Sequence, residues 1–380
     1  MSQRNKAMIF FIGMLILVLA AIAVVYKTLT GYTDFAWYSK FGILFFLIIS
    51  WFSPVWLKLI RHGPEFLNGS FYTFAYQAAY FLMGFVLILS MLLIARDIIW
   101  QILYLLAKKS AFNPDNAHHI NILNVITIVA ALFISAYGVF EAHMSPIAKE
   151  LTISDSRIKK PIKFVVASDF HINQSTSKAH ISKMIKAINA QNPDYILLVG
   201  DIIDDKPEFA LEKFKLLKDL KAKKIYVSLG NHEYYNRPYA WIIEFSKLGF
   251  EVLHNSGEMI DESGIYLAGV PDVGSVSANY ERAFAGSDDQ AYKILLSHSP
   301  TDFKDMDKSA IDLQLSGHTH GGQIFPFQYI TKKANDGYLA GLYQEDGTKL
   351  YVMKGAGYWG PPIRLMAKPD ILVLNLKSEK

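Results

Sequence analysis

Apolar residues are distributed very unevenly along this chain, and their distribution limits what it can fold into. They crowd into roughly the first 145 positions, whereas the rest has the mixed composition of a globular domain. Mean hydropathy is positive, which is unusual for a protein that is soluble throughout. A chain of 380 residues accommodates two domains of common size. We therefore predict a transmembrane region over residues 1–145, a linker over 146–161 and a water-soluble domain over 162–380.

Four stretches of the N-terminal region are long and apolar enough to cross a bilayer. A spanning helix needs about 20 apolar residues, and a helix satisfies its own backbone hydrogen bonds in lipid. The stretches are Ala7–Tyr26, Phe41–Ile60, Phe71–Ala95 and Ile122–Phe140. Arg96 and Asp97 follow the third, and Ile98–Ala107 is too short to cross again. We interpret Ile98–Ala107 as a helical extension in the membrane interface.

Two other interpretations of these stretches stay open. They could be buried helices of a large soluble protein, although this chain offers too little polar shell for four such helices. The first stretch could be a cleaved signal peptide, because Arg4 and Lys6 form a basic start and Ala21–Ala23 resembles a cleavage site. That apolar run is long for a signal peptide, which favours a first membrane helix.

Flanking lysines and arginines indicate how a multi-pass protein of the cell membrane would be oriented. One side of the membrane would carry the lysines and arginines near the N-terminus, those between the second and third stretches, and those after the fourth stretch. Five others would face the opposite side: Lys27, Lys40, Arg96, Lys108 and Lys109. By the positive-inside rule, this distribution narrowly favours a cytoplasmic C-terminal domain.

Charge and cysteine content exclude several functions. The net charge is only +4, and no basic run interleaved with aromatic residues stands out, so we expect no nucleic-acid partner. The chain has no cysteine, which excludes disulfides, thiolate metal sites and a cysteine nucleophile. Any metal ion must therefore be held by His, Asp, Glu or Asn.

The C-terminal part alternates between strand-like and helix-like patterns. Apolar runs with strand character alternate with segments of helical spacing, which predicts βαβ units. The expected strands are Ile162–Phe170, Tyr195–Ile203, Lys224–Leu229, Tyr266–Val270, Tyr292–Ser297, Leu313–Gly317, Leu350–Lys354 and Ile371–Leu376. The expected helices are Ser177–Gln191 and Phe209–Leu220. We predict a mixed α/β domain with a sheet-rich second portion.

Five of these expected strands end in polar residues suited to metal binding. The ends are Asp169-Phe170-His171, Gly200-Asp201 with Asp204, Gly230-Asn231-His232-Glu233, Ser297-His298-Ser299, and Gly317-His318-Thr319-His320-Gly321-Gly322-Gln323. In open α/β sheets, ligands bind beyond the carboxyl ends of the strands. Residues i and i+2 of an extended segment share a face, so Asp169 with His171, and His318 with His320, would point together. Flanking glycines permit tight turns and close backbone approach.

These carboxylates, imidazoles and an amide oxygen suit a divalent ion such as Mn, Zn, Fe or Ni. Each short motif alone is weak, since a lone Asp-x-His is more often a surface pair. The ordered set of five, each after an apolar run, is a much stronger signal. The other histidines lack such a context, and we expect them at surfaces or interfaces: His62, His118, His119, His143, His180 and His254.

The five blocks in this order resemble the calcineurin-like metallophosphoesterase superfamily over residues 162–376. The resemblance implies a four-layer αββα sandwich. The final motif, with Gly360-Pro361-Pro362-Ile363-Arg364 near the end of the chain, resembles the membrane-associated bacterial branch. Many members carry an arginine at the position of Asp205, and Arg364 or a lysine could supply that phosphate-binding cation instead.

The resemblance also implies a site with two divalent metal ions, for which we expect Mn, with Zn, Fe or Ni as alternatives. One ion would be held by Asp169, His171, Asp201 and His320. The other would be held by Asp201, Asn231, His298 and His318, so that Asp201 bridges them. His232 would lie beside the substrate phosphate, with Asp204 orienting it.

Two functions follow as hypotheses. The first is a membrane-anchored phosphodiesterase or pyrophosphatase that uses metal-activated hydroxide, on phosphate ester substrates that include lipid-linked or nucleotide-lipid molecules. Aromatic residues near the last motifs could line an apolar approach or could be core: Phe325, Phe327, Tyr329, Tyr358 and Trp359. The second is a transport or sensor protein with a regulatory phosphoesterase domain, against which the expected spans lack clear buried charges. A broad phosphomonoesterase is a further alternative.

Overall fold

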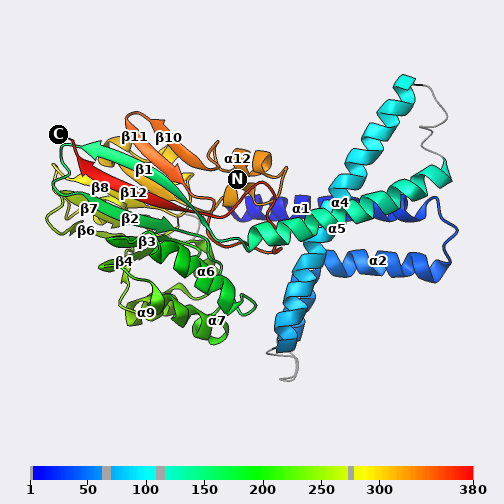
Figure 1. Ribbon diagram of the computed structural model, residues 1–380, viewed down its shortest axis with the longest axis horizontal. Helices are drawn as coiled ribbons and strands as arrows, with labels where there is room; N and C mark the ends of the chain where they lie inside the picture. Colours follow the sequence, from blue (N-terminus) through cyan, green and yellow to red (C-terminus); the bar gives the residue numbers. More distant parts are fainter. Residues whose placement is uncertain (1–2, 62–69, 108–115, 273–277, 380) are drawn as a thin grey trace. The chain divides into compact units, whose positions relative to one another are not determined.

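The computed structural model describes residues 3–61, 70–107, 116–272 and 278–379 (Figure 1). The chain divides into two compact units. The first comprises Met1–Val139 and Gly360–Pro362, and the second comprises Phe140–Trp359 and Ile363–Lys380.

Apolar helices make up the first unit: α1 (Gln3–Thr30), α2 (Trp37–Trp51), α3 (Ser53–Arg61), α4 (Ser70–Ala107) and α5 (Ala117–Ala142). Among the described residues, α4 and α5 are each long and apolar enough to cross a membrane. They contain the third and fourth predicted spans. The apolar part of α1 within the described residues, Val18–Thr30, is shorter than a span.

The second predicted span, Phe41–Ile60, is not one straight helix. It is divided into α2 and α3, which meet at an angle of 71° and together could form a broken span. Pro54 lies in the first turn of α3. A proline lacks the amide hydrogen that would continue α2 and clashes with the preceding turn, so the helix breaks there.

A largely buried charged side chain lies just beyond the third predicted span. The side chain of Arg96 is only 11% exposed, and it donates hydrogen bonds to Asn124 (2.7 Å) and Asp97 (2.9 Å). Asn124 in turn donates to the main-chain oxygen of Thr28 (3.0 Å). Since a buried charge is costly without partners, this network links α1, α4 and α5. The helix runs without a break through Arg96 to Ala107, as predicted for the extension.

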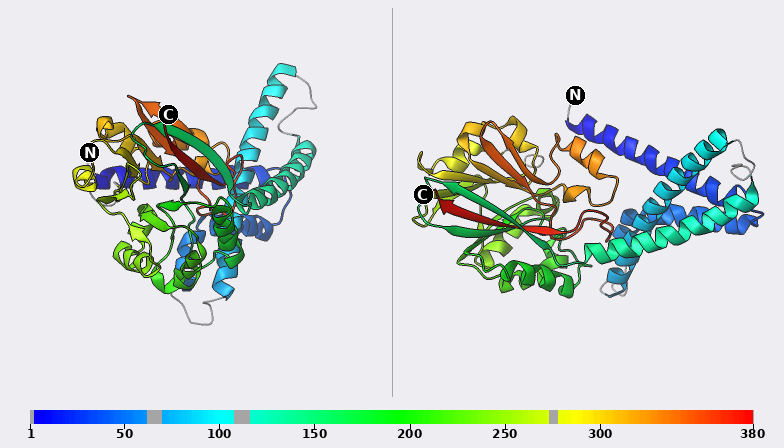
Figure 2. Two further views of the ribbon diagram at one scale, coloured as in Figure 1. Left: turned by 60° about the vertical axis from the view of Figure 1, so that its left-hand side comes forward. Right: turned by 45° about the horizontal axis from the view of Figure 1, so that its top comes forward.

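Two six-stranded sheets form the centre of the second unit (Figures 1 and 2). The first sheet has the order β1 (Ile147–Asp155), β12 (Asp370–Ser378), β2 (Ile162–Ala167), β3 (Tyr195–Val199), β4 (Lys224–Ser228) and β5 (Glu251–Val252). The second has the order β10 (Gly341–Glu345), β11 (Thr348–Val352), β9 (Leu313–Ser316), β8 (Tyr292–Leu296), β7 (Ile265–Gly269) and β6 (Ser256–Ile260). Strands β2 to β5 run parallel, as do β7, β8, β9 and β11.

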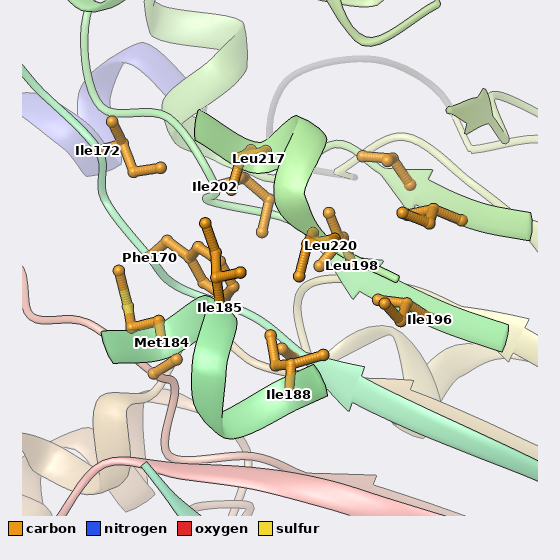
Figure 3. Packing of buried hydrophobic residues seen from close by; sticks show 14 of the residues in the cluster. Phe170, Ile172, Met184, Ile185, Ile188, Ile196, Leu198, Ile202, Leu217 and Leu220 are labelled. Carbon is orange, nitrogen blue, oxygen red and sulfur yellow. The ribbon is translucent and has the colours of Figure 1, made fainter. Parts of the chain in front are cut away.

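Strand β2 shows how the layers are built. Successive side chains of a strand point to opposite faces. Phe164 and Val166 belong to the core between the two sheets, whereas Val165 and Ala167 belong to the core under the helices. In that second core, Met184, Ile185 and Ile188 of α6 (Lys178–Asn189) pack with residues of β3 (Figure 3).

Helices on both outer faces complete the sandwich. The helical cover of the first sheet also includes α7 (Pro207–Phe214) and α9 (Pro238–Lys247). Short helices α10 (Tyr280–Phe284) and α11 (Asp302–Asp305) contribute to the clusters on the outer face of the second sheet. The predicted αββα architecture is therefore confirmed.

The stretch predicted as a linker, residues 146–161, contains a strand. Strand β1 pairs in parallel with β12 over its whole length, from Ile147 opposite Asp370 to Asp155 opposite Ser378. Of its nine residues only Ile153 is buried, because β1 lies at the edge of the sheet. The sequence of an edge strand shows little alternation of apolar and polar residues, so it gives little sign of a strand. The structure of β1 therefore depends on its pairing with a distant segment.

Candidate metal centre

The predicted ligands lie just beyond the carboxyl ends of parallel strands in both sheets. Asp169 follows β2, Asp201 follows β3, and Asn231 begins the short helix α8 (Asn231–Tyr235) after β4. In the second sheet, His298 follows β8 and His318 follows β9. This arrangement agrees with ligand binding at the carboxyl ends of strands.

The backbone of these ligands is not extended, so the expectation that residues i and i+2 of an extended segment share a face was wrong, although the ligands do follow the strand ends as expected. Asp169, His171, Asp201, His318 and His320 all have positive φ, between 48° and 70°. Residues other than glycine rarely adopt this left-handed conformation. It costs on the order of 1–3 kcal/mol per residue and is typical of functional sites. Tight turns after the strands, rather than alternation along them, direct the side chains inward.

One group of candidate ligands comprises Asp169, His171 and His320. The Nε2 atoms of His171 and His320 are 2.9 Å apart. Oδ1 of Asp169 is 3.5 Å from the Nε2 of His320 and 4.0 Å from that of His171. All three side chains are buried.

A second group comprises Asp201, His298 and His318. Oδ2 of Asp201 is 3.1 Å from Nε2 of His298 and 3.8 Å from Nε2 of His171, so this carboxylate faces both groups. Nδ1 of His318 is 3.0 Å from Oδ1 of Asn231. The structure thus brings all seven predicted ligands together.

The donor atoms fit a divalent cation. Nδ1 of His298 lies 2.8 Å from the main-chain oxygen of Val199, and a hydrogen bond there directs Nε2 toward the carboxylates. This buried Nε2 lies 3.1 Å from Oδ2 of Asp201 but forms no hydrogen bond of normal geometry. Buried donor and acceptor atoms without well-formed hydrogen bonds are costly. A cation would satisfy all of these atoms.

The pKa shifts of the histidines differ, and those of His318 and His320 favour metal binding. Burial lowers the pKa of His318, and burial together with His171 and Arg364 lowers that of His320 well below the usual value. Both are therefore neutral, which is the form that binds metal. Burial opposes a charge on His298, but Asp201 outweighs it and raises the His298 pKa.

Glycines allow the strand ends to approach the ligands closely. A Cβ on Gly230 would overlap Oδ1 of Asp201, and one on Gly317 would overlap Oδ2 of Asp169. At Gly200, which has a φ of 72°, a Cβ would lie 2.5 Å from Nδ1 of His298. The expected role of these glycines is confirmed.

We expect Gly317→Ala to weaken metal binding. The new methyl group would displace the Asp169 carboxylate, and such overpacking costs about 1–3 kcal/mol, or roughly ten- to hundredfold in affinity. Calorimetric titration of the metal-free protein with Mn²⁺ measures the loss. Gly286→Ala is the matched control, because its Cβ would meet only the Tyr266 hydroxyl at 3.3 Å. Equal affinities for both variants would contradict the prediction.

Glu233 is a residue whose role the sequence did not reveal, although it completes the Asn-His-Glu motif. Its buried carboxylate accepts hydrogen bonds from the main-chain nitrogens of Asp201 (3.0 Å), Ile203 (2.7 Å) and Gly230 (2.8 Å). It thereby holds together the turns after β3 and β4. The sequence offered one indication of this role, because Glu233 directly follows the motif residues Asn231 and His232.

Arg364 does not supply the phosphate-binding cation that was considered for it. It is fully buried, and it donates to main-chain oxygens of Gly357 (2.9 Å), Ala367 (2.7 Å) and Lys354 (2.8 Å). Asp205 accepts hydrogen bonds from the main-chain nitrogens of Gln174 and Lys206. Arg364 and Asp205 therefore stabilise loops through hydrogen bonds to main-chain atoms.

His232 and Asp204 form a pair beside the first group. Nδ1 of His232 lies 2.5 Å from Oδ1 of Asp204, and the rings of His232 and His171 are 4.6 Å apart. Burial opposes a charge on His232, but the hydrogen bond and charge of Asp204 outweigh it and raise the His232 pKa to about 9. Asp204 therefore favours the protonated form of the imidazole.

Exposed aromatic side chains border His232. Trp359 is 54% exposed with its ring 6.0 Å from that of His232, and Tyr235, which the sequence did not single out, is 69% exposed at 5.4 Å. We call these two residues the aromatic rim. Gln323 exchanges two hydrogen bonds with the backbone of Trp359, at 2.8 and 2.9 Å.

Other expected positions have mixed outcomes. Phe325 and Tyr329 are exposed, which excludes a core role for them, whereas Phe327 and Tyr358 are half-buried. His180 is buried, contrary to its expected surface place. It lies four residues before Met184, so both side chains are on the core-facing side of α6, and this spacing could have been recognised in the sequence.

Comparison with known proteins identifies the family. A model of the calcineurin-like phosphoesterases matches residues 162–322. An uncharacterized metallophosphoesterase of Campylobacter jejuni is 31% identical over 97% of this chain and 98% of its own length. One of Helicobacter pylori is 35% identical over 71% of this chain and 74% of its own. The chain therefore belongs to the calcineurin-like phosphoesterase family, as the ordered motifs predicted.

Some relatives are named as transmembrane proteins. A transmembrane protein with metallophosphoesterase domain from Danio rerio is 28% identical over 67% of this chain and 62% of its own length. Family membership and the clustered donors indicate that this chain is a phosphoesterase hydrolase that binds divalent metal.

Proposed function

We propose that this protein is a membrane-anchored, two-metal phosphodiesterase or pyrophosphatase. The observation that carries the proposal is the buried carboxylate of Asp201, which faces both groups of candidate ligands. Asp169, His171 and His320 would hold one ion with Asp201. Asn231, His298 and His318 would hold the other with Asp201. Mn²⁺ is the ion that we expect at both positions.

Each remaining residue of the site has a chemical role in this proposal. When bound, the two ions would polarise the phosphate oxygens and lower the pKa of a water molecule. His232 carries a proton on a ring that faces the site and would deliver it to the leaving oxygen. Asp204 keeps that ring protonated and oriented. Glu233 keeps the turn of Asp201 in place.

A lipid-linked substrate is the class that the aromatic rim favours. Trp359 and Tyr235 expose large apolar surfaces next to the proton donor. Exposed apolar patches beside a polar centre mark binding sites for apolar partners. Helices α4 and α5 can cross a membrane, where lipid-linked phosphate esters are concentrated.

A comparative assay tests this function. Purified full-length protein with Mn²⁺ is given bis-p-nitrophenyl phosphate, p-nitrophenyl phosphate and a nucleotide-linked diacyl sugar. We expect the diester and the lipid-linked pyrophosphate to be hydrolysed faster than the monoester. A preference for the monoester would indicate a broad phosphomonoesterase. No hydrolysis with metal bound would favour a transport or sensor function of the helices.

The aromatic rim should distinguish lipid-linked from soluble substrates. Burying one aromatic side chain against a substrate is worth about 1.5–3 kcal/mol, so Trp359→Ser should lower kcat/KM for the lipid-linked substrate at least about tenfold. Hydrolysis of bis-p-nitrophenyl phosphate should change little. Tyr239→Ser, which alters another exposed tyrosine, is the control. Equal losses on both substrates would oppose a lipid-binding role.

The proposed orientation places the catalytic domain in the cytoplasm. Protease added to sealed, right-side-out vesicles should therefore leave the C-terminal domain intact, whereas it should digest that domain after detergent is added. An immunoblot against the C-terminus measures this. Digestion in sealed vesicles would reverse the orientation.

A further inference from the structure

Glu141 is an unusual residue for its position. It lies in the last turn of α5, and its side chain is only 1% exposed. Burial is costly for a carboxylate, and the negative end of a helix dipole adds to that cost. A side chain that is unfavourable on both counts needs a specific partner. Oε1 of Glu141 accepts a hydrogen bond from the main-chain nitrogen of Ala367, at 3.0 Å.

Ala367 connects Glu141 to the metal centre. Its main-chain oxygen accepts a hydrogen bond from Nη1 of Arg364, at 2.7 Å. The same Nη1 is 3.3 Å from the main-chain oxygen of His320, and Nη2 is 3.1 Å from Nδ1 of its ring. Glu141 is therefore separated from a candidate ligand by one backbone unit and one fully buried guanidinium.

Arg364 reaches a second candidate ligand through the same network. Both Nε and Nη2 donate to the main-chain oxygen of Gly357, at 2.9 and 2.6 Å. The main-chain nitrogen of Gly357 donates in turn to the main-chain oxygen of Asp169, at 2.9 Å. The turns that bear Asp169 and His320 are thus both attached to Arg364.

We propose that Glu141 is a positioning residue that sets the metal affinity of the group formed by Asp169, His171 and His320. Its hydrogen bond holds Ala367, which holds Arg364, which holds the turns of His320 and Asp169. This inference rests on the proposed metal centre. Partners behind the ligands commonly change metal affinity ten- to hundredfold when they are removed. Because α5 can cross a membrane, the end of a membrane helix and a metal group share one hydrogen-bond network.

Three substitutions of Glu141 distinguish the effect of side-chain length from the effect of charge. Glu141→Ala removes the acceptor, and Glu141→Asp keeps the charge but is too short for Ala367. Glu141→Gln keeps both length and an acceptor oxygen. We expect Ala and Asp to weaken the binding of one Mn²⁺ by about tenfold or more, and Gln to preserve it.

The measurement is calorimetric titration of metal-free, full-length protein with Mn²⁺ in detergent. Ser135→Ala removes another buried polar group from the same helix and should bind both ions like wild type. Saturating Mn²⁺ should restore hydrolysis in the Ala and Asp variants, which a folding defect would not allow. If thermal unfolding shows that Glu141→Ala does not fold, the inference is tested by comparing the Mn²⁺ affinities of Glu141→Asp and Glu141→Gln.

Wild-type affinity for both ions in the Ala and Asp variants would overturn this inference alone. A wild-type protein that binds no Mn²⁺ would instead overturn the proposed metal centre. The two failures are therefore distinguishable in one experiment.

Discussion

Asp201→Asn should abolish metal-dependent hydrolysis. The substitution keeps the size of the side chain but removes the charge that faces His298 at 3.1 Å and His171 at 3.8 Å. A catalytic metal ion supplies several kcal/mol of charge stabilisation, so we expect kcat/KM to fall about 10³-fold or more. The loss should persist at saturating Mn²⁺, because the variant lacks the shared anionic ligand.

Asp205→Asn is the matched control for this prediction. Asp205 is also buried, and its carboxylate accepts hydrogen bonds from the main-chain nitrogens of Gln174 and Lys206, which an amide oxygen can accept as well. We expect activity close to wild type. Wild-type turnover by a metal-saturated Asp201→Asn variant would refute the assignment of Asp201 as the shared ligand.

His232→Ala should lower the rate far more than the metal content. The His232 ring pairs with Asp204, and although it also lies close enough to His171 and Asp204 to form a third group of candidate ligands, the proposal assigns it no metal ion. General acid catalysis contributes about 10²–10⁴-fold, so kcat should fall by that order while bound Mn²⁺ stays near two ions. Elemental analysis and steady-state kinetics on the same preparation measure both quantities.

Two further variants test the role of the pair. Asp204→Asn should produce a smaller loss than His232→Ala, since the ring remains but loses the anion that raises its pKa. His254→Ala changes a histidine outside the site and should have little effect. If His232→Ala loses metal and activity in parallel, His232 acts as a ligand and the proposed role is wrong.

Sequence alone predicted which side chains gather at the site, and their roles as metal ligands stay a prediction. The residues after five strands carry ligand atoms in an order that the family shares, and the structure brings all seven together with His232 and Asp204. The argument that residues i and i+2 share a face of an extended segment was nevertheless wrong. Positive φ at Asp169 and His171 depends on the turns in which they lie, and a strand pattern contains no sign of it.

The fold departs from the sequence-based expectation at two places, for different reasons. Strand β1 exists because β12, more than 200 residues later, supplies its hydrogen-bond partners. The break between α2 and α3 was visible in Pro54, but hydropathy averaged over a window conceals a single residue.

The sequence by itself determined which segments are apolar and which side chains carry atoms suited to binding metal. These properties depend on residue type and local spacing, so they can be read along the chain. Tertiary structure alone decided that Arg364 faces main-chain oxygens rather than substrate, that Glu233 holds the turn of Asp201, and that Glu141 is joined to His320. The partners of a buried charge come from distant segments, and only the folded chain brings them within hydrogen-bond distance.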